Sequence, residues 1–534
     1  MNTSLFDQLK IVADTFQQVK GGGLLLKGQT VSVALPGVPR RFLYHGWQSW
    51  SLTAWADVSW RMPVMRPARF HPMQTDPVHV REKKPHGSWF GAVEIENGGV
   101  VFLGSLGLDA HVVLERDSIR GTFDAEKGDW FLGMGKEEAI FKQYALLLKE
   151  RLGGGRIPTP PRVWCSWYSL YTEISERSLV KILGDLDTRK WPVEVFQIDD
   201  GWQKSIGDWE PNEKFSLGMD GMAAWVKAAD RVAGLWLAPL IAVPSSSLYR
   251  HHRDWLLHDR KGKLVPAGFN WGEPLYALDT THPQALEWLA ALMKKVRGWG
   301  YDYVKLDFLY AGALPGKRHL DLPREAAYRT GLKTIREALG GAYLLTCGAP
   351  IIPSVGLCDG MRIGPDVASY WDNPRDRDLL RNYTVPGTQN ALRTSLNRLW
   401  LQPLLHTDPD AVYFRSVQNS LTQEQKSLLQ DLALIAGFKA TSDMPAWLTK
   451  EEEAALKAYL ASQPSIQRTG AYSYRIDGRE VDFSSHIALP PLPGFLTNIW
   501  GGIIGSLAQN TSLLKAFDRK GRQALKKTLK ANPV

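Results

Sequence analysis

Charged side chains recur where short, apolar, β-type segments of this chain end. They are Asp199, Asp200, Lys305, Asp307, Arg362, Asp366 and Asp443, which follows Ser442. Carboxylates that converge on one site can supply a nucleophile and a general acid or base. Adjacent anions such as Asp199 and Asp200 repel each other, and their burial is costly unless each receives hydrogen bonds. The pattern therefore indicates a polar site, and the elements that carry it must bring these residues together.

The elements expected around these residues alternate between strand and helix. The eight predicted strands are 162–169, 193–200, 232–242, 301–310, 342–348, 360–366, 411–415 and 434–443, with helices between them such as 283–298 and 323–339. Eight β/α alternations predict a TIM-type barrel. An open doubly wound sheet is the alternative, but no Gly-x-Gly-x-x-Gly follows the first strand. Active-site groups of a barrel lie at the carboxyl ends of its strands, where these charged residues stand.

The fourth predicted strand places two charged residues on one face. Side chains alternate along a strand, so Tyr303, Lys305 and Asp307 share one face and the apolar residues 304, 306 and 308 share the other. The polar face is expected to point into the barrel mouth, where Lys305 favours the ionised form of Asp307. Such a carboxylate suits a glycosidase nucleophile. The pattern fits equally well a buried Lys–Asp ion pair that only holds the strand.

The sixth predicted strand leads to a second carboxyl group. Pro365 turns the chain out of regular structure, so Asp366 is expected at the rim, near Tyr370 and Trp371. Apolar surroundings raise the pKa of a carboxyl group and suit a general acid. A retaining glycosidase needs two carboxyl groups about 5–5.5 Å apart, which two strands of one barrel can supply.

The composition excludes several other classes of protein. The chain is 44% hydrophobic and 22% charged, as in globular proteins. It has no apolar run of roughly 18 residues and no apolar signal-peptide core, so a cytoplasmic location is expected. Three cysteines without Cys-x-x-Cys spacing, and adjacent His251 and His252 that point apart, predict no metal or other cofactor.

Charge and tryptophan content bear on the partners. Much of the net charge of +9 lies from Leu513 to the end, where seven Lys and Arg residues accompany one Asp. A solvated helix face is expected there, with an acidic partner or a membrane surface as the less favoured alternative and no nucleic-acid partner. Many of the 21 tryptophans stand in polar turns such as "HGWQSWS" and "DDGWQ". Indoles in such turns line clefts and suit the C–H faces of sugars.

The predicted domain organisation has three parts and a linker. Residues 1–150 are expected to form a β-sandwich, in which Asn97-Gly98 marks a hairpin. Residues 151–161 are rich in Gly and Pro and indicate a linker. Residues 162–450 form the predicted (β/α)8 barrel, and residues 451–534 a small, mostly β C-terminal domain with a basic helical tail.

Several motifs resemble those of the α-galactosidases of glycoside hydrolase family 36. They are "FQIDDGWQ", "GDW", "YVKLDFLYAGA" and "CGAPIIPSVGLCDGMRIGPDVASYW", accompanied by "GLWLAP" and "YALDTTHP". The resemblance covers the barrel from about Pro161 to Asp443, and "HGWQSWS" extends it into the β-sandwich. The short chain is similar to the thermophilic-type members. The resemblance implies a retaining α-galactosidase that cleaves terminal α-galactosides of the raffinose and melibiose type through a covalent galactosyl-enzyme intermediate.

The resemblance also implies a role for each matching residue. Asp307 matches the family's nucleophile, and Asp366 matches its acid/base. The implied substrate contacts are Asp199, Asp200, Trp209, Lys305, Cys347, Gly348, Arg362 and Trp50, with Trp47 a weaker match. Leu309 departs from the pattern, because many relatives have Asn there and gain one hydrogen bond to the sugar. The implied partner is a small oligosaccharide with galactose in the glycone site, and the short chain favours a monomer or small homo-oligomer.

Two other functions compete with this interpretation. An α-N-acetylgalactosaminidase or an α-galactosyl transferase would act through the same intermediate. A non-catalytic sugar-binding relative would need neither a nucleophile nor an acid, so the presence of both Asp307 and Asp366 argues against it.

Overall fold

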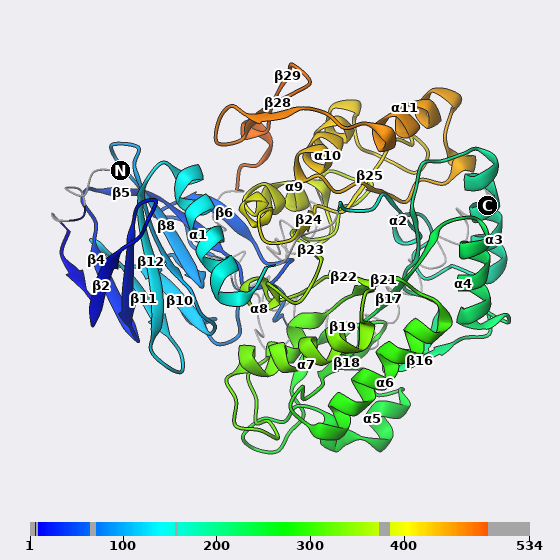
Figure 1. Ribbon diagram of the computed structural model, residues 1–534, viewed down its shortest axis with the longest axis horizontal. Helices are drawn as coiled ribbons and strands as arrows, with labels where there is room; N and C mark the ends of the chain where they lie inside the picture. Colours follow the sequence, from blue (N-terminus) through cyan, green and yellow to red (C-terminus); the bar gives the residue numbers. More distant parts are fainter. Residues whose placement is uncertain are drawn as a thin grey trace, which may run out of the picture.

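The computed structural model describes residues 6, 9–62, 64, 71–154, 159–372 and 385–489 (Figure 1). The predicted basic tail and residues 155–158 of the predicted linker lie outside these ranges. The N-terminal sheets lie beside a central parallel sheet, and the small C-terminal sheet lies at the top of the view. No helix in the described part of the chain has the length and apolarity needed to cross a membrane. The domain boundaries given above stay predictions.

The N-terminal part contains two antiparallel sheets. In spatial order, one consists of β1 (Ile11–Val12), β4 (Thr30–Ala34), β11 (Ser118–Phe123), β10 (Ala110–Leu114) and β7 (His86–Ser88). The other consists of β2 (Thr15–Gln18), β3 (Leu24–Gly28), β12 (Gly128–Gly135), β9 (Val100–Ser105), β8 (Phe90–Ile95), β5 (Pro39–His45) and β6 (Thr53–Asp57). Trp130 of the second sheet packs so closely on Gly121 of the first that a Cβ there would lie 2.6 Å from its ring. The predicted β-sandwich is therefore confirmed.

The turn between β8 and β9 forms where the sequence predicts a hairpin. Gly98 has a φ of 79°, which glycine adopts without strain. Helix α1 (Glu137–Leu152), in contrast, was not predicted. It buries Ile140, Tyr144 and Leu148, and the Tyr144 hydroxyl donates to the Ser105 carbonyl at 2.8 Å. The spacing of these apolar residues is the helical signal, and the helix extends into the predicted linker.

The central sheet is parallel and closes on itself. In spatial order its strands are β24 (His406–Asp408), β23 (Gly360–Arg362), β22 (Tyr343–Thr346), β21 (Tyr303–Leu306), β17 (Val232–Leu237), β14 (Val195–Ile198), β13 (Val163–Cys165), β26 (Ala440–Thr441) and β25 (Ala411–Val412). The two outermost strands, β24 and β25, are separated in the chain only by Pro409 and Asp410. They are two halves of one interrupted strand, so eight strands complete the predicted barrel.

Several strand predictions were wrong in their bounds: residues 167–169 of the first, for example, lie in helix α2 (Trp167–Leu170). The seventh strand was expected at residues 411–415, but its first half is His406–Asp408, which pairs with β23. Pro409 and the positive φ of Asp410, 90°, interrupt the strand and obscured this half in the sequence. Residues 434–436 of the expected eighth strand instead end helix α10 (Gln423–Ala436), which Gly437 terminates in a left-handed conformation. A short apolar run does not distinguish a buried strand from a buried helix turn.

Helices surround the barrel, and short elements shape its mouth. The longer helices are α3 (Glu176–Thr188), α4 (Gly218–Ala228), α6 (Pro283–Trp299), α7 (Arg324–Leu339), α9 (Thr388–Leu396) and α10. Both α6 and α7 lie where the sequence predicts helices. The short elements include β15 (Gln203–Ser205), β16 (Asp208–Pro211), β18 (Ile241–Ala242), β19 (Pro266–Asn270) and β20 (Glu273–Ala277), and also α2 (Trp167–Leu170), α5 (Ser247–His251) and α8 (Ile351–Ser354).

The C-terminal part begins with helix α11 (Lys450–Ala461), which the Thr449 hydroxyl caps by accepting from the Glu452 amide. Strands β27 (Ile466–Arg468), β28 (Ser473–Ile476) and β29 (Arg479–Asp482) follow it and pair in that order. The predicted β region of the C-terminal part is therefore confirmed within the described residues, and a helix precedes it.

A buried polar cluster joins the sandwich to the first turn of α7. Arg324 donates to both carboxylate oxygens of Asp76, at 2.8 and 2.6 Å. Oε2 of Glu325 accepts from the Trp89 indole at 2.9 Å and from the Asp109 amide at 2.6 Å. Burial raises the pKa of Glu325 to about 8. The N-terminal part is therefore fixed to the barrel by groups that are costly to leave unpaired.

Candidate active site

The carboxyl ends of the barrel strands bring the predicted residues together. Asp307 directly follows β21, and its Oδ2 accepts a hydrogen bond from the Trp236 indole of β17 at 3.0 Å. Its Oδ1 accepts from the Phe308 amide at 2.9 Å. Burial raises the pKa of Asp307 above its ordinary value, and the nearby charge of Lys305 lowers it. Two donors thus orient this carboxylate and favour its anion.

Lys305 has a different partner from the one that the strand pattern suggested. Its Nζ lies 3.0 Å from Oδ2 of Asp199, and both side chains are buried. The same carboxylate oxygen accepts from Gln197 at 2.6 Å. The alternative of a buried Lys305–Asp307 ion pair that only holds the strand is therefore wrong. The carboxylate that Lys305 contacts is Asp199, at the end of β14, which is separated from β21 in the sheet by β17.

Asp200 has its own set of donors, which explains how two adjacent carboxylates are tolerated. Its Oδ1 accepts from Gln203 at 2.6 Å, and its Oδ2 accepts from the Trp271 indole at 2.7 Å. Burial raises the pKa of Asp200 to about 6. The Asp199 carboxylate is held by Lys305 instead, so the two neighbours do not compete for the same donors.

Asp366 forms an ion pair with Arg362, which stands four residues before it in the sequence. Nη2 of Arg362 is 3.0 Å from Oδ1 of Asp366 and 2.5 Å from Oδ2 of Asp410. Oδ2 of Asp410 also accepts from the Tyr168 hydroxyl and from the Val367 amide. The apolar surroundings that the sequence suggested for Asp366 are therefore wrong, since a guanidinium contacts it. Its side chain is 28% exposed.

The charge of Asp366 acts on Asp307. It contributes to the raised pKa of Asp307, as two carboxylates in one site do. Cys347 and Gly348 follow β22, and the nearby Cys347 thiol lowers the pKa of Asp307. The predicted residues from β14, β21, β22 and β23 thus meet in one site.

Aromatic side chains enclose the mouth. Trp50, from the loop between β5 and β6, contacts the Phe308 ring at a centroid distance of 5.1 Å. It lies so close to Gly348 that a Cβ there would be 2.9 Å from the indole. Trp209, on β16, contacts the Trp236 ring at 6.0 Å. The indole N–H groups of Trp50 and Trp209 are buried, and neither has a hydrogen-bond partner among the described residues.

Three aromatic residues of the site were missed or misplaced by the sequence analysis. Phe308 was expected on the strand face opposite to the barrel mouth, but its φ of 55° turns the side chain toward Trp50 and Trp271. Trp271 stands at the tip of the β19–β20 hairpin with a φ of 52°, ahead of Gly272. "NWG" is the turn signal that could have identified it. Trp236 lies inside an apolar run and carries no such signal.

Trp47, the weaker match, uses its indole N–H differently. The group donates to the Pro72 carbonyl at 2.8 Å, and the Arg324 guanidinium lies 5.6 Å from the ring centroid. Its ring contacts Tyr310 rather than a residue named above as a substrate contact.

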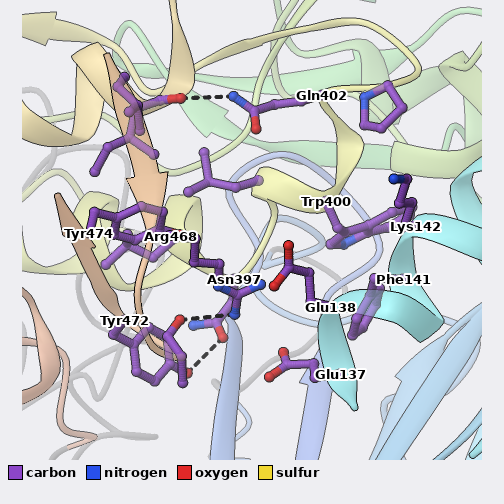
Figure 2. Close-up of a pocket in the computed structure, with 16 residues that line it drawn as sticks. Glu137, Glu138, Phe141, Lys142, Asn397, Trp400, Gln402, Arg468, Tyr472 and Tyr474 are labelled. Atoms are coloured by element: carbon purple, nitrogen blue, oxygen red, sulfur yellow. Dashed lines mark hydrogen bonds between the residues drawn. The ribbon is translucent and has the colours of Figure 1, made fainter. Parts of the chain in front are cut away.

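A pocket of about 340 Å³ lies away from the residues of the candidate active site (Figure 2). It is bounded by α1, by the turn of 3-10 helix η6 (Leu399–Leu401) and by the C-terminal sheet. The Tyr472 hydroxyl donates there to Asn397 at 2.9 Å, beside Arg468 and Glu138. None of the predicted site residues lines it. Within the described ranges no group of three or more His, Cys, Asp or Glu side chains could hold a metal ion.

Comparison with known proteins agrees with this architecture. Residues 137–343 match the family model described as Melibiase. The α-galactosidase AgaA of Geobacillus stearothermophilus is 34% identical over 125 residues, which cover 22% of this chain and 17% of AgaA. An α-galactosidase of Escherichia coli is 30% identical over 169 residues, which cover 29% of this chain and 23% of that protein. The matched stretches thus span less than a quarter of the length of these curated relatives.

Solved structures extend the similarity over most of the chain. TtGalA, an α-galactosidase from Thermus thermophilus in complex with p-nitrophenyl α-D-galactopyranoside, is 44% identical, with a TM-score of 0.85. The match covers 89% of this chain and 97% of TtGalA. The fold alone is shared with the family 36 α-galactosidase AgaA of Geobacillus stearothermophilus, at 17% identity, a TM-score of 0.58, and coverage of 86% of this chain and 68% of AgaA.

A closed parallel barrel with paired carboxylates at its mouth, covered by tryptophans from a β-sandwich, defines a barrel glycoside hydrolase. The similarity to TtGalA, which extends over 97% of that protein, identifies the family within this class. The chain belongs to glycoside hydrolase family 36, the family of these α-galactosidases.

Proposed function

We propose that this chain is a retaining α-galactosidase that hydrolyses terminal α-galactosides of the raffinose and melibiose type. The observation that carries the proposal is the meeting of Asp307 and Asp366 at the barrel mouth, where the charge of one raises the pKa of the other. Structures of TtGalA with p-nitrophenyl α-D-galactopyranoside and with stachyose support the substrate class.

Asp307 is the nucleophile in this proposal. It is 8% exposed and held by the Trp236 indole and the Phe308 amide, which suits an anion aimed at one carbon atom. Its attack on the anomeric carbon forms the covalent galactosyl-enzyme ester. The two donors stabilise the carboxylate again when it is released.

Asp366 is the acid/base. In the first step its carboxyl proton passes to the glycosidic oxygen as the bond to the leaving group breaks. In the second step the Asp366 carboxylate takes a proton from the water that attacks the anomeric carbon, and Asp307 is released. Its exposed fraction of 28% supports this role, because the group must reach a departing aglycone and an incoming water.

The remaining predicted residues bind the galactose unit. Asp199 and Asp200 accept hydrogen bonds from sugar hydroxyls, and the unpartnered indole N–H groups of Trp50 and Trp209 donate to sugar oxygens. A site with fixed donors and acceptors penalises an epimer whose hydroxyl points elsewhere, because buried polar groups then stay unpaired. Lys305, Cys347, Gly348 and Arg362 complete the proposed substrate contacts, and the substrate is held without a cofactor.

Azide rescue tests the assigned roles. With an activated aryl α-galactoside, Asp307→Ala plus azide should yield β-galactosyl azide, because azide replaces the nucleophile. Asp366→Ala plus azide should yield α-galactosyl azide, because azide opens the intermediate from the face that water would use. Asp431→Ala is a matched control. Asp431 is an aspartate on α10 whose partner is Arg479 of the C-terminal part, and it belongs to neither of the two proposed roles. Exchanged product configurations would mean exchanged roles.

A substrate panel tests the sugar specificity. Aryl α-galactoside, α-N-acetylgalactosaminide, α-glucoside and β-galactoside are compared by kcat/KM, and the α-galactoside should be preferred. Equal rates on the α-glucoside and α-galactoside would contradict the proposed function. A preference for the α-N-acetylgalactosaminide would favour the competing hydrolase activity.

A further inference from the structure

The loop that carries Trp47 and Trp50 leaves the sandwich and docks on the barrel. It consists of residues 46–51 and joins β5 to β6. The Ser49 amide donates to the Ala349 carbonyl at 3.0 Å, and the Ala349 amide donates to the Ser49 hydroxyl at 3.0 Å. These bonds place the loop directly beside the segment that follows β22, where Trp50 meets Gly348.

Arg398 lies beneath this loop and is fully buried, with 0% exposure. Its guanidinium donates to the carbonyl oxygens of Gly46 (3.2 Å), Gln48 (2.9 Å), Ser49 and Ser51 (2.9 Å), and to the Thr53 hydroxyl (3.1 Å). Nη1 also donates to the Ile363 carbonyl at 3.0 Å, three residues before Asp366. The Arg398 side chain, at the start of η6, thus binds the carbonyl groups of a loop more than 300 residues away in the sequence.

The burial of this guanidinium is costly. No carboxylate among the described residues forms an ion pair with Arg398, and burial lowers its pKa to about 9. Carbonyl groups and the Thr53 hydroxyl compensate the charge, so the loop must keep the conformation in which they converge. A guanidinium offers five N–H groups in a planar fork, whereas a lysine ammonium offers three from one point. Only the arginine side chain can therefore bind this many carbonyl groups together.

We propose that Arg398 is a positioning residue for the sugar site. It holds loop 46–51 in the conformation that sets Trp50 against Phe308, the residue after Asp307. Through Ile363 it ties the same loop to the chain that leads to Asp366. The inference rests on the proposed function only in taking Trp50 as part of a galactoside site.

Arg393, on α9 and five residues before Arg398, provides a matched control. It is also buried, at 2% exposure, and also donates to backbone carbonyls. Its acceptors include the carbonyls of Ile487 and Ala488, both at 3.0 Å and both in the C-terminal part of the chain, and Oδ1 of Asn390 at 2.9 Å. Replacing either arginine by lysine removes the same kind of interaction, but only one of the two holds loop 46–51.

The first experiment measures amide hydrogen exchange by mass spectrometry in the full chain. Arg398→Lys should increase exchange in peptides that cover residues 46–53 and leave residues 486–489 unchanged, while Arg393→Lys should do the reverse. Thr53→Val is a milder second variant, because it removes the hydroxyl that accepts from Arg398 and from the Gly46 amide. It should increase exchange at 46–53 in the same direction. Unchanged exchange at 46–53 in both Arg398→Lys and Thr53→Val overturns the proposal, whatever the enzyme hydrolyses.

The second experiment measures kinetics on p-nitrophenyl α-galactoside. Arg398→Lys should raise KM about tenfold or more, as misplaced substrate contacts do, and Arg393→Lys should change it less than about twofold. Added to Trp50→Ala, Arg398→Lys should have little further effect on KM, because both changes act through the same ring. Equal KM changes in the two lysine variants, or full additivity with Trp50→Ala, overturns the positioning role. An inactive wild-type chain would instead contradict the proposed function, and the exchange result would still decide the inference.

Discussion

Replacing Trp236 by phenylalanine removes the side-chain hydrogen bond that Oδ2 of Asp307 accepts at 3.0 Å. Burial already raises the pKa of Asp307, and the Trp236 indole opposes this by stabilising the anion. The loss of the donor should therefore raise the pKa further. A hydrogen bond to a charged group contributes about 1.5–3 kcal/mol, and each unit of pKa corresponds to about 1.4 kcal/mol. The expected upward shift is thus about one to two units.

The assay is kcat/KM for p-nitrophenyl α-galactoside as a function of pH. The acid side of this profile reports the group of the free enzyme that must be ionised for attack. In Trp236→Phe this side of the profile should move about one to two units toward neutral pH. At the pH optimum kcat/KM should also fall roughly 10- to 100-fold, because the carboxylate has lost one of its two orienting donors.

Trp202→Phe is the control. The Trp202 indole is equally buried and donates at 3.0 Å to the backbone carbonyl of Trp236, not to a carboxylate. Both substitutions shorten a buried indole and should lower Tm to a similar degree. If the acid side of the Trp236→Phe profile coincides with that of Trp202→Phe, or moves to lower pH, Asp307 is not the ionised nucleophile that Trp236 holds.

Three further substitutions have expected outcomes. Trp209→Phe keeps an aromatic ring but removes an unpartnered N–H, so KM should rise about tenfold with little change in Tm; a lower Tm with unaltered KM would indicate a core role. Asp200→Ala should reduce kcat/KM on the α-galactoside more than about 100-fold while the chain stays folded, and an unreduced preference over the α-glucoside would contradict its role. Burial raises the pKa of Glu325 from 4.5 to about 8, so folding favours its protonated form and stability decreases as pH rises through this interval. The free energy of unfolding is measured in urea at pH 5 and pH 8. Glu325→Gln should reduce the difference between these two values by at most about 5 kcal/mol, and an unchanged difference would show that Glu325 does not titrate in this interval.

Much of the fold was readable because its signals are local. The β-sandwich hairpin at Asn97-Gly98 and helices α6 and α7 follow from turn residues and from apolar periodicity over a few neighbours. The side-chain faces of β21 follow from strict alternation, which predicts Lys305 and Asp307 on one face. The interrupted seventh strand was not readable, because the partners that define β24 and β25 belong to β23 and β26, far away in the sequence.

The sequence by itself determined which residue types stand at the strand ends, and therefore that Asp199, Asp200, Asp307 and Asp366 meet at one rim of a barrel. Only the tertiary structure decided their partners. Lys305 binds Asp199 instead of Asp307, Asp366 is paired with Arg362, and Trp271 donates to Asp200. The reason is physical: a strand pattern specifies the direction of a side chain, but a hydrogen bond depends on distances of about 3 Å between elements that the chain brings together only on folding.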